Sequence, residues 1–126
     1  MIEAFIESWK RVSFGNETFL LYKIELKRSE PHLTWKIERR YSEFYELHGK
    51  VKKIIERDVK YFTLLEDAFP SKQIFSLQTD LFAEKRARSL DSYIQILMAM
   101  METNRSQSEE FNRILQVFFE IKDVIG

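Results

Sequence analysis

The chain has 126 residues, with 20 basic and 20 acidic side chains, two histidines and no cysteine. That length fits one domain that buries a core without crosslinks, and the balanced charge argues against a general nucleic-acid binder, which carries a large positive excess. The missing cysteine excludes a disulfide scaffold, a thiolate metal site and a cysteine nucleophile, and it is compatible with a cytoplasmic setting. We therefore expect one domain over residues 1–126, with any anion site built from local clusters of charge.

The first third of the chain predicts strands. Apolar residues alternate with charged or polar ones over residues 22–27 and again over 33–38, which is the two-residue period of a half-buried strand. Residues 2–12 are a less regular candidate. Turn-forming residues at 15–16 and 29–31 separate the three segments. The pattern predicts a three-stranded antiparallel meander.

The second half predicts helices. Ser42 is placed to cap the first, Thr79 or Asp80 to start a longer second, and Ser106 with Glu109 makes a capping-box pattern for a third. The faces that we expect to be buried are Phe44, Leu47, Val51, Ile54 and Ile55 in the first, Ala83, Ala87, Leu90, Ile94, Leu97 and Met101 in the second, and Phe111, Ile114, Leu115 and Phe118 in the third.

Residues 58–79 lack a clear helical period and contain Pro70, so they are predicted to form one long loop. Strands followed by helices indicate an α+β fold, a three-stranded antiparallel β-meander packed against a bundle of about three α-helices. No stretch approaches the ~20 apolar residues that span a bilayer, and the first ten residues have no long apolar run that would indicate a signal peptide. A chain of this kind that meets a membrane is expected to lie on it.

The Arg39-Arg40-Tyr41 sequence joins the last predicted strand to the first predicted helix. Guanidinium groups bind phosphate through forked, charge-assisted hydrogen bonds, and the adjacent ring offers a flat floor for a sugar or inositol. Taken alone, two arginines at a strand end are more often ordinary solvated side chains.

The predicted loop supplies a second cluster, in which Lys72 follows Pro70. Lysine serves as a point charge for phosphate, and Ile74, Phe75 and Leu77 are apolar enough to enter a lipid interface. The alternative is that Phe75 covers the edge of the core. The stretch ahead of Pro70 is acidic, and an anionic membrane would repel it.

The start of the long helix supplies the third cluster. Arg86, Leu90 and Tyr93 follow helical spacings along one stripe, and Arg88 is nearby. Arg86 therefore lies at the edge of the buried face, where a bound anion would explain it. The competing interpretation is an aliphatic stem that covers the core with its charge in water.

In this order, the three clusters resemble the phox-homology (PX) family. The matching residues are Arg39-Arg40-Tyr41-Ser42-Glu43-Phe44-Tyr45-Glu46-Leu47, then Pro70-Ser71-Lys72, then Arg86 with Leu90 and Tyr93. The resemblance covers nearly the whole chain. It implies a sorting-nexin-like, phosphoinositide-binding module that recognises phosphatidylinositol 3-phosphate and is peripheral on endosomal, vacuolar or lysosomal membranes.

The resemblance also implies roles for individual residues. Arg40 would hold the 3-phosphate, and Tyr41 would pack under the inositol ring. Lys72 would meet the 1-phosphate, and Arg86 would bond the 4- and 5-hydroxyls, which disfavours lipids phosphorylated there. Arg39 and Arg88 would support the site, and Ile74, Phe75 and Leu77 would insert into the membrane.

Two other functions remain as alternatives. A domain of the same fold can bind protein partners, with a weak or different lipid preference. An enzyme is the less favoured alternative, because the chain has only His32 and His48, three glycines, and neither a Gly-rich phosphate loop nor a metal-spaced histidine pair. We expect no catalysis, cofactor, metal or nucleic-acid partner.

Overall fold

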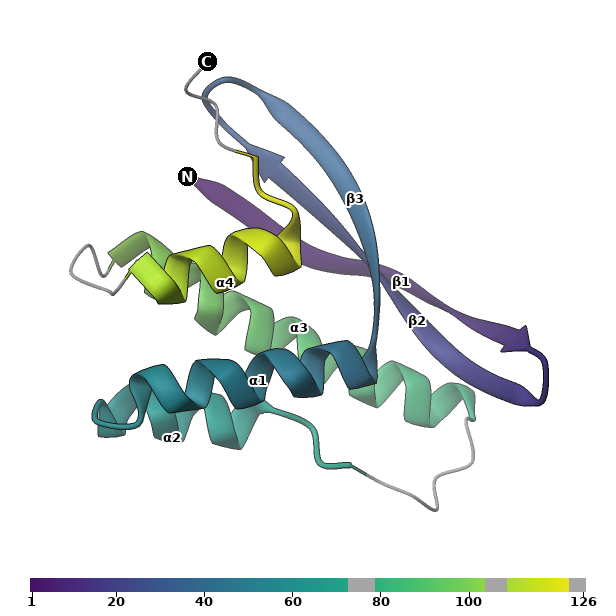
Figure 1. Cartoon of the computed structure of the whole chain (residues 1–126). Helices are drawn as coiled ribbons and strands as arrows, with labels where there is room; N and C mark the ends of the chain where they lie inside the picture. The colour runs from purple at the N-terminus through teal and green to yellow at the C-terminus, as the bar shows by residue number, and fades with distance from the viewer. Residues whose placement is uncertain (73–78, 104–108, 123–126) are drawn as a thin grey trace.

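The computed structural model describes residues 1–72, 79–103 and 109–122. Within these residues the chain forms a sheet of three strands followed by four helices (Figure 1). The elements are β1 (Ile2–Phe14), β2 (Glu17–Arg28), β3 (Leu33–Arg40), α1 (Tyr41–Ile55), α2 (Val59–Ala68), α3 (Asp80–Thr103) and α4 (Glu109–Phe119). The predicted α+β class is confirmed, with one helix more than expected.

The sheet is an antiparallel meander in the order β1-β2-β3, as predicted. The register between β1 and β2 shifts between Ile6 and Ser8. A bulge of this kind breaks the two-residue alternation, which explains why the first strand looked irregular in the sequence. The β1–β2 turn contains Gly15 at a φ of 62°, a left-handed conformation that glycine adopts without a steric penalty.

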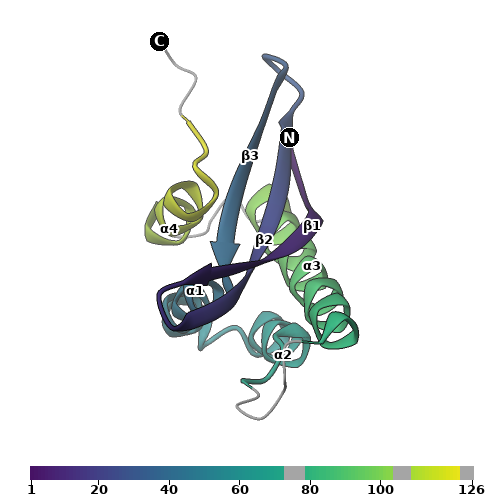
Figure 2. The ribbon, with the colours of Figure 1, turned by 90° about the vertical axis from the view of Figure 1, so that its right-hand side faces the viewer.

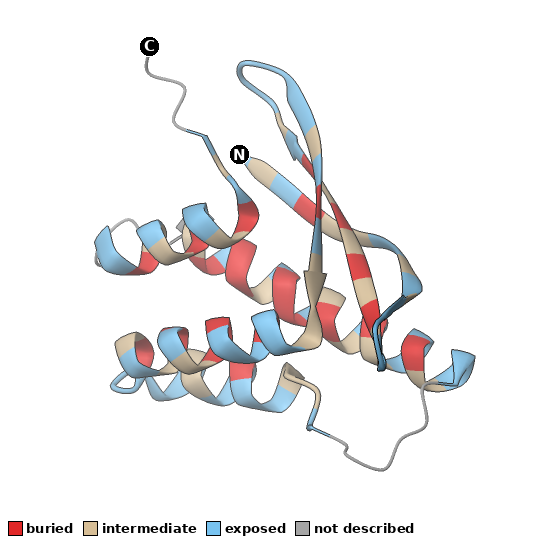
Figure 3. Ribbon diagram, turned by 45° about the vertical axis from the view of Figure 1, so that its right-hand side comes forward, coloured by how far each residue is buried: buried red, intermediate tan, exposed pale blue. Residues whose placement is uncertain are grey.

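The core lies where the sheet meets the helices. Leu20, Tyr22, Ile24 and Leu26 of β2 are all buried, because strand alternation turns them to one face. The helix α3 packs along β1, α4 packs against α1, and α2 packs against α3. Figure 2 shows α4 and α3 to either side of the strands, and Figure 3 shows buried positions concentrated where helices and strands face one another.

Most of the predicted helix faces are confirmed. The buried members are Phe44, Leu47, Val51, Ile55, Ala83, Ala87, Leu90, Ile94, Leu97, Phe111 and Leu115, and the half-buried ones are Ile54, Met101, Ile114 and Phe118. Tyr93 and Phe119 are also fully buried. None of the helices in the described ranges is both long and apolar enough to cross a membrane.

The helix starts agree with prediction only in part. The prediction of Ser42 as a cap is wrong, because α1 already begins at Tyr41 and Arg40 occupies the capping position. The backbone amide of Arg40 donates to the Glu43 carboxylate at 2.8 Å, so an acid in the first turn satisfies the exposed amide.

Thr79 does open the long helix. Its hydroxyl oxygen accepts from the Phe82 amide at 3.1 Å, which is an N-cap contact, and α3 begins at Asp80. Ser106, the predicted cap of the last helix, lies outside the described residues.

The prediction of one long loop over residues 58–79 is wrong, because Val59–Ala68 form α2. The Asp58 carboxylate accepts from the Tyr61 amide at 3.3 Å and caps this helix. Leu65 is buried, and the half-buried apolar residues on its face are Tyr61, Phe62, Ala68 and Phe69. These five positions have the i, i+1, i+4, i+7, i+8 spacing of a short amphipathic helix.

Two side chains of β3 hold the end of α4. The indole N–H of Trp35 donates to the Phe119 carbonyl at 2.9 Å, and Arg39 donates to the Phe118 carbonyl at 2.6 and 3.1 Å. The chain then turns at Glu120, whose φ is 53°. These contacts satisfy carbonyls that have no partner within a helix, and they fix α4 to the sheet.

Candidate functional site

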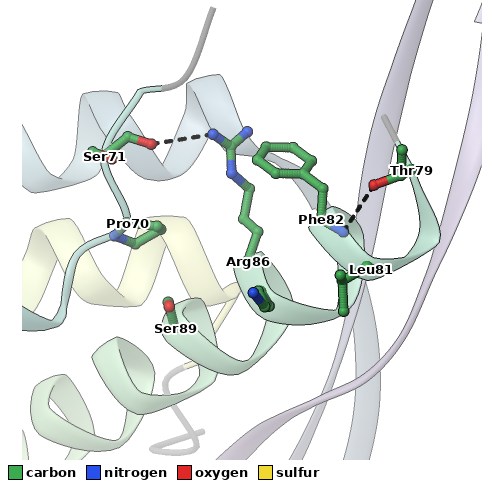
Figure 4. Close-up of a pocket in the computed structure, with 8 residues that line it drawn as sticks. Pro70, Ser71, Thr79, Leu81, Phe82, Arg86 and Ser89 are labelled. Atoms are coloured by element: carbon green, nitrogen blue, oxygen red, sulfur yellow. Dashed lines mark hydrogen bonds between the residues drawn. The ribbon is translucent and has the colours of Figure 1, made fainter. Parts of the chain in front are cut away.

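Three segments that are distant in sequence meet around Pro70 and Ser71. The Tyr41 hydroxyl, at the start of α1, donates to the Pro70 carbonyl at 2.7 Å. Arg86, in the second turn of α3, donates through Nη2 to the Ser71 carbonyl at 3.2 Å (Figure 4). The segment that follows α2 is thereby tied to both helices, and it forms one wall of a cavity of about 480 Å³ whose opposite wall is α3.

Arg86 is the central cation of this region. Its guanidinium carbon lies 3.8 Å from the centroid of the Tyr41 ring and 4.5 Å from that of Phe82. Among the described residues, its buried Nε has no hydrogen-bond partner. Burial lowers the pKa of Arg86, while Tyr22 and Tyr41 raise it in part; arginine nevertheless stays protonated. A half-buried cation with an unused donor is suited to an anionic or hydroxyl-rich ligand.

Two tyrosines share this environment. Burial raises the pKa of Tyr41 above its ordinary value of 10, against a smaller opposing effect of Arg86, so its hydroxyl remains a donor near neutral pH. Burial raises the pKa of Tyr22 to about 12. Within the described part of the chain the buried Tyr22 hydroxyl has no hydrogen-bond partner, which adds a second unused polar group near Arg86.

The other two predicted ligand residues lie around this centre. Lys72 follows Ser71 directly, and its ammonium lies 5.6 Å from the centroid of the Tyr45 ring. The Arg40 guanidinium lies 3.8 Å from the centroid of Phe19, on the sheet face opposite to Tyr22. The structure therefore joins Tyr41 and Arg86 in direct contact, with Lys72 beside them, whereas Arg40 is not among the residues that line the cavity.

The residues expected to support the site lie elsewhere. Arg39 is occupied by the carbonyl of Phe118 and by Glu120, with the Glu120 carboxylate at 3.0 Å. Arg88 lines a separate cavity beside Trp9 of β1. The three predicted insertion residues Ile74, Phe75 and Leu77 lie outside the described residues.

An aromatic cluster under the site was missed in the sequence. The Phe69 centroid lies 5.6 Å from that of Tyr41 and 4.4 Å from that of His48, with the His48 and Phe69 rings nearly parallel. His48 stands four residues after Phe44 on the apolar stripe of α1, a position that could have indicated burial. The wall formed by Pro70 and Ser71 therefore rests on packed rings.

His48 is buried and doubly hydrogen-bonded. Its Nδ1 lies 2.8 Å from the Tyr93 hydroxyl, and its Nε2 lies 2.9 Å from the Glu66 carboxylate. Lys52 also binds Glu66 at 2.9 Å, so this acid of the stretch ahead of Pro70 is paired with a cation. Burial lowers the pKa of His48, against the opposing effect of Glu66, and the bonds to Lys52 and His48 lower the pKa of Glu66.

These shifts predict a loss of stability on acidification in two steps. The unfolded chain takes up a proton near His48's ordinary pKa of 6.5 while the folded chain resists it, so stability falls as pH drops below that value. Glu66 adds its own loss only below its ordinary value of 4.5. Between pH 7.5 and 5.5, the free energy of unfolding measured in urea should fall by up to about 1 kcal/mol through His48.

The matched pair His48→Gln and His32→Gln isolates this effect. His32 is exposed in the turn between β2 and β3, so its variant should keep the full pH dependence. The His48 variant should lose stability at both pH values but show a smaller difference between them. An unchanged difference would assign the pH dependence to other groups.

Comparison with known proteins identifies the family of this chain. The family model described as PX domain matches residues 27–120. Human sorting nexin-13 is 32% identical over 85 residues, which is 66% of this chain and 8% of that protein. Mouse kinesin-like protein KIF16B is 27% identical over 93 residues, which is 74% of this chain and 7% of that protein. The chain spans less than a tenth of the length of either relative.

Solved structures show the same fold. A designed CISK-PX domain superposes with a TM-score of 0.65 at 28% identity, covering 90% of this chain and 98% of that one. The mouse SNX19 PX domain with bound sulphate ion superposes with a TM-score of 0.64 at 19% identity, covering 97% of this chain and 98% of that one. With the family model matching most of its length, the chain belongs to the PX domain family, whose members are typically phosphoinositide-binding modules that associate peripherally with membranes.

Proposed function

We propose that this domain binds phosphatidylinositol 3-phosphate and thereby attaches its protein to endosomal, vacuolar or lysosomal membranes. The observation that carries the proposal is Arg86, which is half-buried, stacked on Tyr41, and left with an unused donor among the described residues. No catalytic step is proposed for the domain.

The proposed roles follow the family pattern. Arg86 bonds the inositol hydroxyls, and Tyr41 supports the ring. Lys72 meets the 1-phosphate next to the membrane, and Arg40 holds the 3-phosphate. In this proposal Ile74, Phe75 and Leu77 add apolar contacts with the lipid. Head-group recognition then supplies specificity, and loop insertion prolongs the bound state, since stable anchoring takes two signals.

The contact energies favour binding of the head group by Arg40 over its present contact with an aromatic ring. A cation–π contact at a partly exposed site contributes ~0.5–1 kcal/mol, and such contacts hold Arg40 over Phe19 and Arg86 over Tyr41. A hydrogen bond between a charged group and its ligand contributes ~1.5–3 kcal/mol. A head group that gains one such bond from Arg40 therefore outweighs the contact with Phe19 that Arg40 leaves, while Arg86 keeps its contact with Tyr41.

Sedimentation with liposomes across the full set of phosphoinositides tests the proposal. Phosphatidylinositol 3-phosphate should retain the domain at least about tenfold better than unphosphorylated phosphatidylinositol. Retention should fall as salt rises, because the contacts are ionic. Equal retention by both lipids would contradict the proposal, and binding to proteins without a response to any phosphoinositide would favour the protein-interaction alternative.

Arg40→Ala tests the role proposed for Arg40, whose guanidinium reaches the ligand only by leaving Phe19. The variant should lose about tenfold in affinity for the same liposomes, which corresponds to one charged hydrogen bond. A variant that sediments with these liposomes as well as the wild type does would show that Arg40 does not contact the head group.

A further inference from the structure

A further cavity lies between α1 and α4, and it shares no lining residue with the cavity beside Arg86. Its volume is about 540 Å³, within the usual range for ligand pockets of about 300–1,000 Å³. The apolar residues that line it are Leu47 of α1 and Ile114, Val117 and Phe118 of α4. Val117 is 73% exposed, so this apolar surface is open to an occupant. We call the cavity the α1–α4 groove.

The walls of the α1–α4 groove match the length of a short helix. The ring of Phe44, near the start of α1, lies 5.0 Å centroid to centroid from that of Phe118, near the end of α4, so the two helices run in opposite directions (Figure 1). The lining residues of α4 extend from Glu110 to Phe118, which is about 12 Å, or roughly two turns. Grooves of this kind bind amphipathic helices through apolar anchors at intervals of three, four and seven residues.

Charged residues of both signs form the rims of the groove. Glu46 and Lys50 lie on the α1 rim, and Glu110 and Arg113 lie on the α4 rim. Because the helices are antiparallel, Lys50 lies towards Glu110, and Glu46 lies towards Arg113. The described residues form no ion pair across the groove, whereas Glu46 and Lys50 pair along α1 at 3.8 Å. An occupant with a basic group towards Glu46 and an acidic group towards Arg113 therefore complements both rims.

A second copy of this chain does not offer a helix that fits the groove. The strongly exposed apolar residues of the described helices are Tyr45, Val59, Leu64, Leu81 and Val117. No two of them lie on one helix at an interval of three or four residues, so none of these helices presents an apolar stripe to solvent. The helix that fills the groove therefore belongs to a different protein.

The groove is on the opposite side of α1 from the proposed head-group site. Tyr41 and His48 face Phe69, with ring centroids 5.6 and 4.4 Å from that of Phe69. Because an α-helix turns once in 3.6 residues, Glu46 and Lys50 point roughly the other way. A ligand at the head-group site therefore leaves the groove accessible.

We propose that the α1–α4 groove binds an amphipathic helix of a partner protein. Apolar side chains of that helix, at intervals of three or four residues, pack over Leu47, Ile114 and Val117. A basic side chain on one flank pairs with Glu46, and an acidic side chain on the other flank pairs with Arg113. None of the groove residues has a role in the proposed function, so the domain contacts a protein and a lipid independently.

Fluorescence anisotropy with three synthetic helical peptides tests this inference. The peptides share a stripe of leucines at intervals of three and four, with alanine and glutamine elsewhere. They differ only in the two residues that flank the middle of the stripe, which are lysine and glutamate, two lysines, or two glutamates. The variants are Val117→Glu, Arg113→Glu and the matched control Val59→Glu, which changes a valine of α2 that is 74% exposed. Thermal unfolding verifies that each variant is folded.

The lysine–glutamate peptide should bind the wild type about threefold more tightly than either other peptide, the size expected for an exposed ion pair. Val117→Glu should weaken it by at least about tenfold, because a charge then lies under the apolar anchors. Val59→Glu should bind like the wild type. Arg113→Glu should shift the preference to the two-lysine peptide, because both rims then carry an acid. Soluble short-chain phosphatidylinositol 3-phosphate should not displace the peptide.

Several results would overturn the inference and leave the proposed function untouched, because lipid binding is measured separately. They are absence of binding by all three peptides, equal weakening by Val117→Glu and Val59→Glu, and a peptide preference that Arg113→Glu does not change. Displacement of the peptide by the soluble lipid would place it at the head-group site instead. The domain alone should sediment as a monomer, and a dimer that Val117→Glu dissociates would show that a second copy occupies the groove.

Discussion

Arg86→Gln is expected to weaken binding to phosphatidylinositol 3-phosphate liposomes by at least about tenfold while leaving the domain folded. The loss follows from removing one or more charged hydrogen bonds to the head group, each worth ~1.5–3 kcal/mol. Stability should change little, because the lost hydrogen bond to Ser71 and the lost contacts with Tyr41 and Phe82 are offset by removal of a charge that burial disfavours.

The measurement pairs liposome sedimentation with urea unfolding for Arg86→Gln and Arg88→Gln. Both variants lose one positive charge from the same helix, so general attraction to an anionic surface falls equally in both. Only Arg86→Gln should lose the preference for the phosphorylated lipid. If both variants bound equally well, Arg86 would not contact the head group.

Arg39→Ala should have the opposite effect, lowering stability by about 2–3 kcal/mol with little change in lipid affinity. The Arg39 side chain is only 15% exposed and makes two charged hydrogen bonds to the Phe118 carbonyl. Its removal leaves the end of α4 without those donors, and each such bond contributes ~1.5–3 kcal/mol. The ion pair with the exposed Glu120 adds little.

Arg28→Ala is the matched control for this variant. Arg28 also ties the C-terminal segment to the sheet, through a single bond to the Lys122 carbonyl at 2.8 Å, so its removal should cost less than Arg39→Ala. Urea unfolding gives the two free energies, and sedimentation at a temperature where each variant is folded gives the affinities. A stable Arg39→Ala protein with weakened lipid binding would show that Arg39 takes part in binding the lipid.

Local rules were sufficient for most of the fold. The alternation over residues 22–27 depends only on which side of a strand faces the core, so β2 could be predicted from its own residues. The short helix α2 could not, because only Leu65 of its ten residues is fully buried and its apolar face continues to Phe69 at the capping position. A longer window that included Phe69 would have shown the helical spacing.

The candidate site was harder to predict, because its geometry is made between elements. Tyr41 and Arg86 donate to the backbone carbonyls of Pro70 and Ser71. Every residue carries such a carbonyl, so the side chains in the sequence do not indicate which ones are used. The convergence of α1, α3 and the segment between α2 and α3 came from the family resemblance alone. Phe69 and His48 were missed for the same reason, since each depends on the other for its packing.

The register of β3 decides which face of the sheet each of the two basic residues at its end occupies. Position 39 faces the helical layer, where its side chain holds the end of α4, and position 40 faces away from that layer, where its side chain stacks over Phe19. Consecutive positions in a strand always diverge in this way. A related chain that replaced the first basic residue would need another donor for that terminus, whereas a change at the second would cost the contact with Phe19 and leave the end of α4 in place.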